Sequence, residues 1–220
     1  MITLFEDYKT MSEYVAAVAA ETIESNPNCK LGLPTGSTPI GMYSNLIQFD
    51  LDWSNVKTFN LDEYENISHV HPESYHMYMR RNLFLHVNLK EENIHFPDNK
   101  YDKTIKNEGG LDVTILGIGH NGHIAFNEPG SSLTSRTRKV KLTEETIQAN
   151  SRFFKTIDEV PKRAFTMGMK TIRESKRIIL IANGSDKWKI LDECFNGNVT
   201  KDRPASILQV HPKIEVFYAS

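Results

Sequence analysis

The chain has 220 residues, of which 39% are hydrophobic and 25% charged, and its formal net charge is −2. This composition can bury a sizeable core, which excludes an intrinsically disordered chain, and the length suits one domain over residues 1–220. Lysines and arginines are scattered, and no apolar run is long enough to span a bilayer, so we expect neither nucleic acid nor a membrane as partner. An N-terminus without signal-like features and two distant cysteines, Cys29 and Cys194, favour a reduced, cytoplasmic protein.

Short apolar runs alternate with segments of helical periodicity along the chain. The expected strands are residues 1–5, 30–33, 56–61, 113–116, 164–167, 177–182 and 214–218. The expected helices run from Thr10 to a stop at 26–28 and over 40–47, 72 to about 86, 143–151, 170–174 and 185–195. We expect Thr10 to open a capping box, Ser37 or Thr38 to cap a helix with Pro39 in its first turn, and Pro72 to begin another. The alternation predicts an α/β fold: a single domain with a doubly wound, mostly parallel, Rossmann-like sheet and helices on both faces.

The loop from Gly117 to Gly130 follows a predicted buried strand and contains four glycines, His123 and Glu128. Glycines allow a ligand to approach the backbone closely, and a histidine with a glutamate can move protons near neutral pH. The loop begins with Gly-x-Gly-x-x-Gly, which is typical of dinucleotide sites. However, Pro129 makes a long helix there unfavourable, and no acidic residue follows at the expected distance. The segment therefore favours a catalytic loop at the carboxyl end of a strand.

Two further loops follow predicted strands. The first contains Thr35, Gly36, Ser37 and Thr38, whose backbone N–H and hydroxyl groups could hold a phosphate, although a capped turn explains the same residues. It lacks the Gly-Lys-Ser/Thr of a nucleoside-triphosphate loop. The second begins with Asp62 and Glu63, which read either as a catalytic base or as a solvated acidic turn. Because parallel strands end at the same edge of a sheet, we expect all three loops to converge.

The remaining candidates point to packing rather than chemistry. The other histidines show no spacing typical of a metal site, so we expect no metal. A helical stripe is expected to pack in the core; its members are Tyr75, Met79, Leu83 and Leu85.

In these three loops the sequence resembles the glucosamine-6-phosphate deaminase (isomerase) family, in its short bacterial form. The motifs that carry the resemblance are Leu31 to Pro39, Phe59 to Tyr64, and Gly117 to Pro129. Further matches are His71 to Tyr75, Asn150 to Phe154 and Leu208 to Pro212. Several motifs in one order over nearly the whole chain make the resemblance specific.

The resemblance implies conversion of D-glucosamine 6-phosphate and water to D-fructose 6-phosphate and ammonia, without a metal or organic cofactor. It implies that His123 opens the sugar ring, that Glu128 orients and supports His123, and that Asp62 moves a proton between C2 and C1. It also implies a catalytic position at Asn121. The phosphate is expected to bind Thr35, Gly36, Ser37 and Thr38, with Arg152 and Lys187 as cationic partners.

Two departures from the family pattern shape further expectations. Longer members carry aspartate where this chain has Asn121, so we expect Glu128 alone to supply negative charge to the imidazolium of His123. Longer members also form hexamers activated by N-acetylglucosamine 6-phosphate. Arg138 fits that effector pattern, but Val140 stands where the pattern has lysine. We therefore expect a monomer or small homo-oligomer without such activation. Separately, residues 143–162 are a candidate lid over the site.

Three alternatives remain open. A galactosamine-6-phosphate deaminase/isomerase would use the same chemistry on the C4 epimer. A 6-phosphogluconolactonase would share the fold, and a non-catalytic sugar-phosphate sensor would share the scaffold. The retention of Asp62, His123 and Glu128 argues against the sensor, since a sensor does not need proton-transfer groups.

Overall fold

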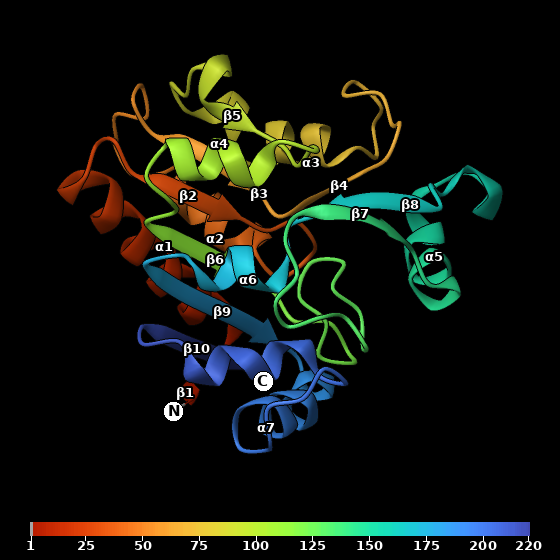
Figure 1. The fold of residues 1–220 in the computed structure, drawn as a ribbon. Helices are drawn as coiled ribbons and strands as arrows, with labels where there is room; N and C mark the ends of the chain where they lie inside the picture. The colour runs from red at the N-terminus through yellow and green to blue at the C-terminus, as the bar shows by residue number, and fades with distance from the viewer. Residues whose placement is uncertain (1) are drawn as a thin grey trace.

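A seven-stranded parallel sheet forms the centre of the computed structural model, which describes residues 2–220 (Figure 1). In spatial order its strands are β1 (Ile2–Phe5), β10 (Ile214–Ala219), β9 (Arg177–Asn183), β6 (Val113–Leu116), β2 (Lys30–Leu33), β3 (Lys57–Asn60) and β5 (Ile94–His95). Every adjacent pair is parallel. The predicted α/β fold with a mostly parallel sheet is confirmed; β5 was not predicted.

Helices cover both faces of this sheet, as predicted (Figure 1). One face packs against α1 (Tyr8–Ser25), α2 (Ile40–Leu46) and α3 (Tyr75–Asn82). The other packs against α4 (Tyr101–Asn107), α6 (Met169–Arg173) and α7 (Trp188–Phe195). Side chains of one strand alternate between the two cores: in β9, Ile179 faces the first and Leu180 the second. Burial on both faces explains why the central strands read as continuous apolar runs.

A second, antiparallel sheet of three strands lies beside the central one. Its strands are β4 (Asp62–Tyr64), β8 (Arg163–Thr166) and β7 (Arg138–Lys141), in that order. The strand predicted at 164–167 lies here and not in the parallel sheet. Neither β4 nor β7 was predicted, because β4 is very short and β7 has three charged residues among four and none that is fully buried. Between β7 and β8 lies α5 (Glu144–Asn150), and Figure 1 shows this region projecting from the main body.

Several helix starts differ from the prediction. Asp7 caps α1 by accepting a hydrogen bond from the backbone N–H of Thr10, so Thr10 lies inside the first turn. Pro39 itself is the N-cap of α2, and no side chain caps that helix. Ser74 caps α3, which leaves Pro72 before the helix. Helix α5 begins as predicted, with Thr143 as its cap. Short 3-10 helices cover Phe84–His86, Glu91–Asn93, Ser151–Phe153, Ile157–Glu159, Ser185–Lys187 and Pro204–Val210.

The strand order reverses between β2 and β6. From β2 the chain proceeds outward to β3 and β5, whereas from β6 it proceeds in the other direction to β9 and β10. Open α/β sheets bind their ligands at the carboxyl ends of the strands at such a reversal. Here β9, β6, β2 and β3 are four consecutive neighbours, so the loops that follow them share one edge.

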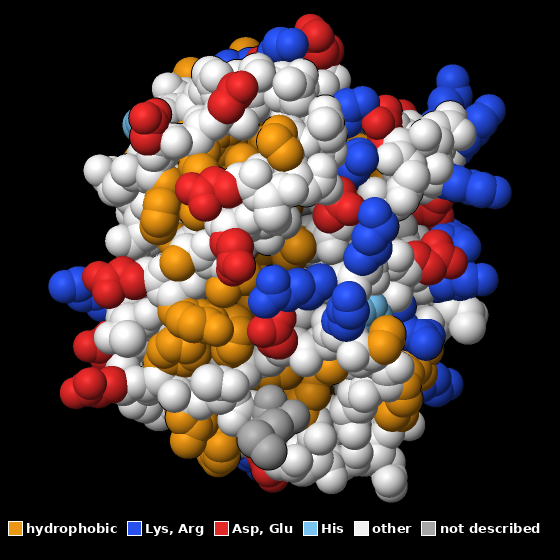
Figure 2. All heavy atoms as spheres, turned by 90° about the vertical axis from the view of Figure 1, so that its left-hand side faces the viewer, with side chains coloured by type: hydrophobic (Ala, Val, Ile, Leu, Met, Phe, Trp, Pro, Cys, Tyr) orange, Lys and Arg blue, Asp and Glu red, His pale blue; other side chains and the backbone are white. Residues whose placement is uncertain are grey.

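The exterior carries charges of both signs. On the face shown in Figure 2, positive and negative side chains are interspersed with hydrophobic ones. Within residues 2–220, no helix has the length and apolar character needed to cross a membrane. Cys29 and Cys194 are both free and buried.

The pairing of β2 with β6 predicts an intolerance of side chains at Gly32. Gly32 lies opposite Thr114, and a Cβ at this position would lie 2.5 Å from the Thr114 hydroxyl. That hydroxyl is itself buried in a 2.7 Å hydrogen bond with Ser175. We expect Gly32→Ala to lower the free energy of unfolding by about 1–3 kcal/mol, measured by urea denaturation. In a Thr114→Ala background, where the clashing hydroxyl is absent, Gly32→Ala should lower the free energy of unfolding much less than it does in the wild type. An equal loss in both backgrounds would contradict this account.

Candidate active site

A cavity of about 300 Å³ opens where the four loops meet. Its lining includes residues that follow β2, β3, β6 and β9, together with residues of α5 and the segment after it. Eight of the ten predicted site residues line it: Thr35, Gly36, Ser37, Thr38, Asp62, His123, Arg152 and Lys187. The other two, Asn121 and Glu128, contact the imidazole of His123. The structure therefore brings the three predicted loops together at one site.

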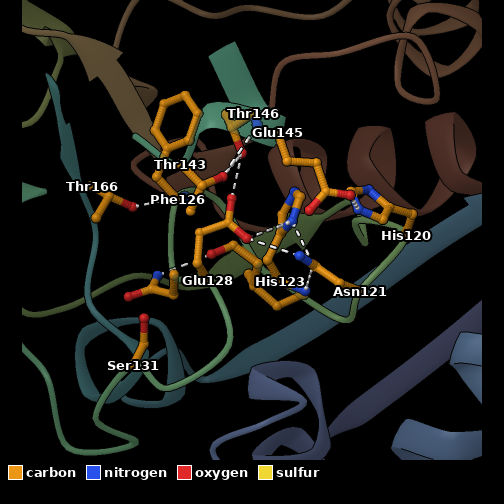
Figure 3. Close-up of polar contacts among 12 residues, drawn as sticks. His120, Asn121, His123, Phe126, Glu128, Ser131, Thr143, Glu145, Thr146 and Thr166 are labelled. Carbon is orange, nitrogen blue, oxygen red and sulfur yellow. Dashed lines mark hydrogen bonds and ion pairs between the residues drawn. The ribbon is translucent and has the colours of Figure 1, made fainter. Parts of the chain in front are cut away.

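His123 is held by an amide and a carboxylate (Figure 3). Its Nδ1 lies 2.8 Å from Asn121 Oδ1 and 3.4 Å from Glu128 Oε2. The Nδ2 group of Asn121 donates to Glu128 Oε2 at 3.0 Å. Asn121 is thus the nearer partner of the imidazole, and it links the ring to the carboxylate.

The direction of these hydrogen bonds sets the tautomer of His123. Glu128 as a carboxylate can only accept, so the Asn121 group that faces it is the NH₂. The Oδ1 of Asn121 then faces the imidazole and requires a proton on Nδ1. Nε2 consequently keeps its lone pair and can accept a proton from a ligand.

Glu128 remains ionised despite being largely buried. Burial on its own would raise the pKa of this carboxyl. His123, through a hydrogen bond and its positive charge, outweighs this effect together with hydrogen bonds from Thr146 and Asn121, and the pKa is lowered to about 2. The donors act on both oxygens, since Thr146 Oγ1 lies 2.6 Å from Oε1 and Asn121 Nδ2 lies 3.0 Å from Oε2. A negative charge therefore lies beside the imidazole throughout the neutral range.

Asp62 begins β4 and pairs with Thr166 of β8. Its carboxyl is 7% exposed, and burial, reinforced by the negative charge of Glu63, raises its pKa to about 8. Glu63 points the other way, as alternate residues of a strand do. Its oxygens accept the backbone N–H groups of Tyr64, Tyr75 and His76. The acidic pair is thus neither a solvated turn nor two equivalent groups, because Glu63 has a structural role and only Asp62 lines the cavity.

The loop after β2, which also lines the cavity, is suited to an anion. Gly36 has a φ of 99°, a conformation that favours glycine. The N–H groups of Gly36, Ser37 and Thr38 donate to no acceptor among residues 2–220. The Thr38 hydroxyl is bound to Asn183 Oδ1 at 2.8 Å, which ties the loop to the end of β9. Lys187 approaches from after β9, and exposed Arg152 lies on the ring of Phe153 at the rim.

The predicted site residues did not include several polar residues that line the cavity, among them Tyr75, Thr146 and Asn150. Tyr75 was expected in the core stripe, where Met79 and Leu83 are indeed buried, but Leu85 is 64% exposed. Tyr75 instead stacks on Phe126 of the His123 loop, with ring centroids 6.1 Å apart. Its motif, His71 to Tyr75, was the available signal. Among residues 2–220, no cluster of three His, Cys, Asp or Glu side chains could hold a metal ion.

The profile of one known family matches residues 6–216; its description is glucosamine-6-phosphate isomerases/6-phosphogluconolactonase. The chain belongs to this family. It is 46% identical to a glucosamine-6-phosphate deaminase of Thermoanaerobacter pseudethanolicus, over 96% of this chain and 88% of that one. It is also 46% identical to the corresponding deaminase of Halothermothrix orenii, over 97% and 94% of the two chains.

Solved structures of the family share the fold. A monomeric glucosamine-6-phosphate deaminase superimposes with a TM-score of 0.96 at 40% identity, over 99% of this chain and 96% of that one. A 6-phosphogluconolactonase from Trypanosoma brucei superimposes with a TM-score of 0.80 at 19% identity, over 100% and 95% of the two chains. The second likeness is one of fold alone.

The packing of His123 predicts that Gly119 tolerates no side chain. A Cβ at Gly119 would overlap the imidazole ring, which lies directly against this backbone. We expect Gly119→Ala to displace the ring and lower kcat/KM about 100-fold or more, since small misplacements of a catalytic group have effects of that size. Thermal unfolding recorded in parallel should show a folded protein, and a folded variant with wild-type activity would contradict the placement of His123.

The raised pKa of Asp62 predicts a pH-dependent cost in stability. In the unfolded chain this carboxyl ionises near pH 3.8, whereas in the folded protein it ionises near pH 8. Between these values the folded state holds the extra proton, so stability falls as the pH rises. We expect Asp62→Asn to stabilise the protein by roughly 2 kcal/mol at pH 8 and to lose this advantage as the pH falls toward 4. Thermal unfolding across this range tests it, with the exposed Asp50→Asn as control; a difference independent of pH would refute it.

Proposed function

We propose that this protein converts D-glucosamine 6-phosphate and water to D-fructose 6-phosphate and ammonia. The observation that carries the proposal is one cavity lined both by Asp62 and His123 and by the loop of Thr35 to Thr38, with Lys187 and Arg152. A hexose 6-phosphate combines the two groups that such a lining suits, an anion and a reactive C1–C2 unit. The names of relatives 46% identical over nearly the whole chain support the same reaction.

Ring opening is the first step and falls to His123. Its Nε2 accepts the proton of the C1 hydroxyl and delivers a proton to the ring oxygen as the C1–O5 bond breaks. A single group must first accept and then donate, which suits an imidazole. The imidazolium formed in between is stabilised by the Glu128 carboxylate, while Asn121 keeps the ring oriented.

Isomerisation follows and falls to Asp62. Its carboxylate removes the proton from C2 of the open-chain aldehyde and returns it to C1 through an enolamine-type intermediate. The resulting imine at C2 is hydrolysed by water, which releases ammonia and leaves the ketose. A buried carboxylate is a stronger base than a solvated one, because burial disfavours its charged form. Ring opening uses His123, the transfer between C2 and C1 uses Asp62, and water supplies the oxygen in imine hydrolysis, so the proposal needs no cofactor.

The alternatives are weighed by what each reaction requires. Lactone hydrolysis needs no base at C2, so a buried Asp62 facing the cavity favours the deaminase over the lactonase. The lactonase likeness, at 22% identity or less among the structures compared, supports the fold alone. Galactosamine 6-phosphate differs only at C4 and stays the alternative substrate. A sensor would not need a base whose ionisation costs stability.

We further propose that residues 1–220 act as one domain, as a monomer in the cytoplasm, without activation by N-acetylglucosamine 6-phosphate. A monomeric deaminase with a TM-score of 0.96 supports the oligomeric state. The guanidinium of Arg138 supports the lack of activation, because it donates to Asn127 Oδ1 at 2.9 Å and is partly buried. In this position Arg138 braces the His123 loop.

The proposal is tested by offering the purified protein three substrates: glucosamine 6-phosphate, galactosamine 6-phosphate and 6-phosphogluconolactone. We expect ammonia and fructose 6-phosphate in equal amounts from the first, and a loss of about 1,000-fold in Asp62→Asn. We also expect kcat/KM to rise with pH up to about 8, as Asp62 becomes deprotonated. Hydrolysis of the lactone with no ammonia from either amino sugar would refute the proposal, and a preference for the galacto epimer would redirect it.

A further inference from the structure

The carboxylate of Glu128 is held from outside its own loop. Thr146 belongs to α5, between β7 and β8, and its Oγ1 lies 2.6 Å from Glu128 Oε1 (Figure 3). Thr146 is only 9% exposed, although α5 itself projects from the main body. This contact joins α5 to the pair of Glu128 and His123.

The hydroxyl of Thr146 has a fixed direction. Its Oγ1 lies 3.0 Å from the Oγ1 of Thr143, which also accepts the backbone N–H of Thr146 as the cap of α5. Because ionised Glu128 can only accept, Thr146 must donate to it, and Thr143 must donate to Thr146. A series of hydrogen bonds therefore runs from Thr143 through Thr146 to Glu128. Asn121 connects Glu128 in turn to His123.

A second contact of α5 provides a comparison. Glu145, the neighbour of Thr146, lies 2.7 Å from His120 Nε2, again between α5 and the loop after β6. Both side chains of this pair are exposed, at 66% and 49%, and an exposed ion pair contributes little to stability. The two contacts hold the same elements together, but only that of Thr146 touches Glu128.

We propose that Thr146 is a positioning residue for the reaction: its hydroxyl fixes the Glu128 carboxylate, and through it the orientation of His123. This inference rests on the proposed function and deepens it. The position of α5 against the His123 loop thereby affects how well His123 can accept a proton. Because Thr146 acts through Glu128, the effect of Thr146 on kcat should disappear when the Glu128 carboxylate is removed.

The test compares Thr146→Val, which keeps the shape but removes the hydroxyl, with Thr146→Ser, which keeps the hydroxyl. We expect Thr146→Val to lower kcat about tenfold, in line with a lost hydrogen bond to a charged group, and to change KM less than about twofold. Thr146→Ser should retain at least about half of the wild-type kcat. Equal losses in both variants, or a loss confined to KM, would overturn the proposal.

Two further variants separate positioning from mere docking of α5. Glu145→Gln removes the negative charge that faces His120 without touching Glu128, and should leave kcat within about twofold of wild type. In a Glu128→Gln background, Thr146→Val should cost little more, because the carboxylate it serves is gone. Losses in Glu145→Gln as large as those in Thr146→Val, or additive losses in the double variant, would identify a structural role only.

A readout without turnover keeps this inference separable from the reaction itself. We expect the ring signals of His123 in NMR spectra to move in Thr146→Val and to move less in Glu145→Gln, which reaches His123 only through the edge contact of the His120 ring, with centroids 5.9 Å apart. If the wild type releases no ammonia, the proposed reaction fails while this comparison still decides the role of Thr146. Unchanged His123 signals in Thr146→Val would overturn it.

Discussion

The carboxyl end of β8 fixes the positions of both Asp62 and the loop of His123. Asp62 pairs with Thr166, and the N–H of Met167 donates to Leu61 at 2.7 Å, so the start of β4 is fixed here. The loop of His123 is fixed at the same point. The N–H of Phe126 donates to the Thr166 hydroxyl at 3.1 Å, and the side chain of Asn127 donates to the Met167 carbonyl at 2.7 Å. Two loops from different strands of the central sheet therefore share one anchor on the small sheet, which fixes Asp62 and the His123 loop relative to one another.

The same arrangement explains the different fates of Asp62 and Glu63. In a strand, neighbouring side chains face opposite sides, so the pairing with β8 directs one carboxylate into the cavity and the other toward α3. Glu63 receives four hydrogen-bond donors or partners there, whereas no side chain or backbone group of residues 2–220 forms a hydrogen bond with the Asp62 carboxyl. The rings of Tyr75 and Phe126, which line the same cavity as Asp62, stack on one another, and Tyr64 packs against Tyr75. The charged form of Glu63 is thus stabilised, whereas the ionisation of Asp62 is costly, which fits the proposed role of Asp62 as the base.

The central sheet and its edge could be predicted because burial on both faces leaves a strong apolar signal in β6 and β9, and because glycines and prolines mark the loops after them. The convergence of the three loops followed from parallel topology. The small sheet could not be predicted, since Asp62 to Tyr64 is too short to show a period and Arg138 to Lys141 is half exposed. Thr146 was missed for a related reason: its importance comes from a contact with Glu128, 18 residues away, that depends on how α5 returns against the loop. The roles of Asp62, His123, Glu128, Arg152 and Lys187 stay predictions that only activity measurements can test.

Asn121 shows how one negative charge can be enough at this site. With a carboxylate at position 121, two acids would flank the imidazole within hydrogen-bonding distance, and each would disfavour the ionisation of the other. An amide removes that repulsion and adds direction, because its NH₂ can only face Glu128 and its oxygen can only face Nδ1 of His123. The expectation that Glu128 alone supplies the charge is consistent with this geometry, but the charge acts partly through the amide, since Asn121 lies closer to the ring. The neutral amide thus orients the imidazole and the carboxylate supports it electrostatically, which makes the fixed position of Glu128, and the contacts that fix it, central to the proposed proton transfer.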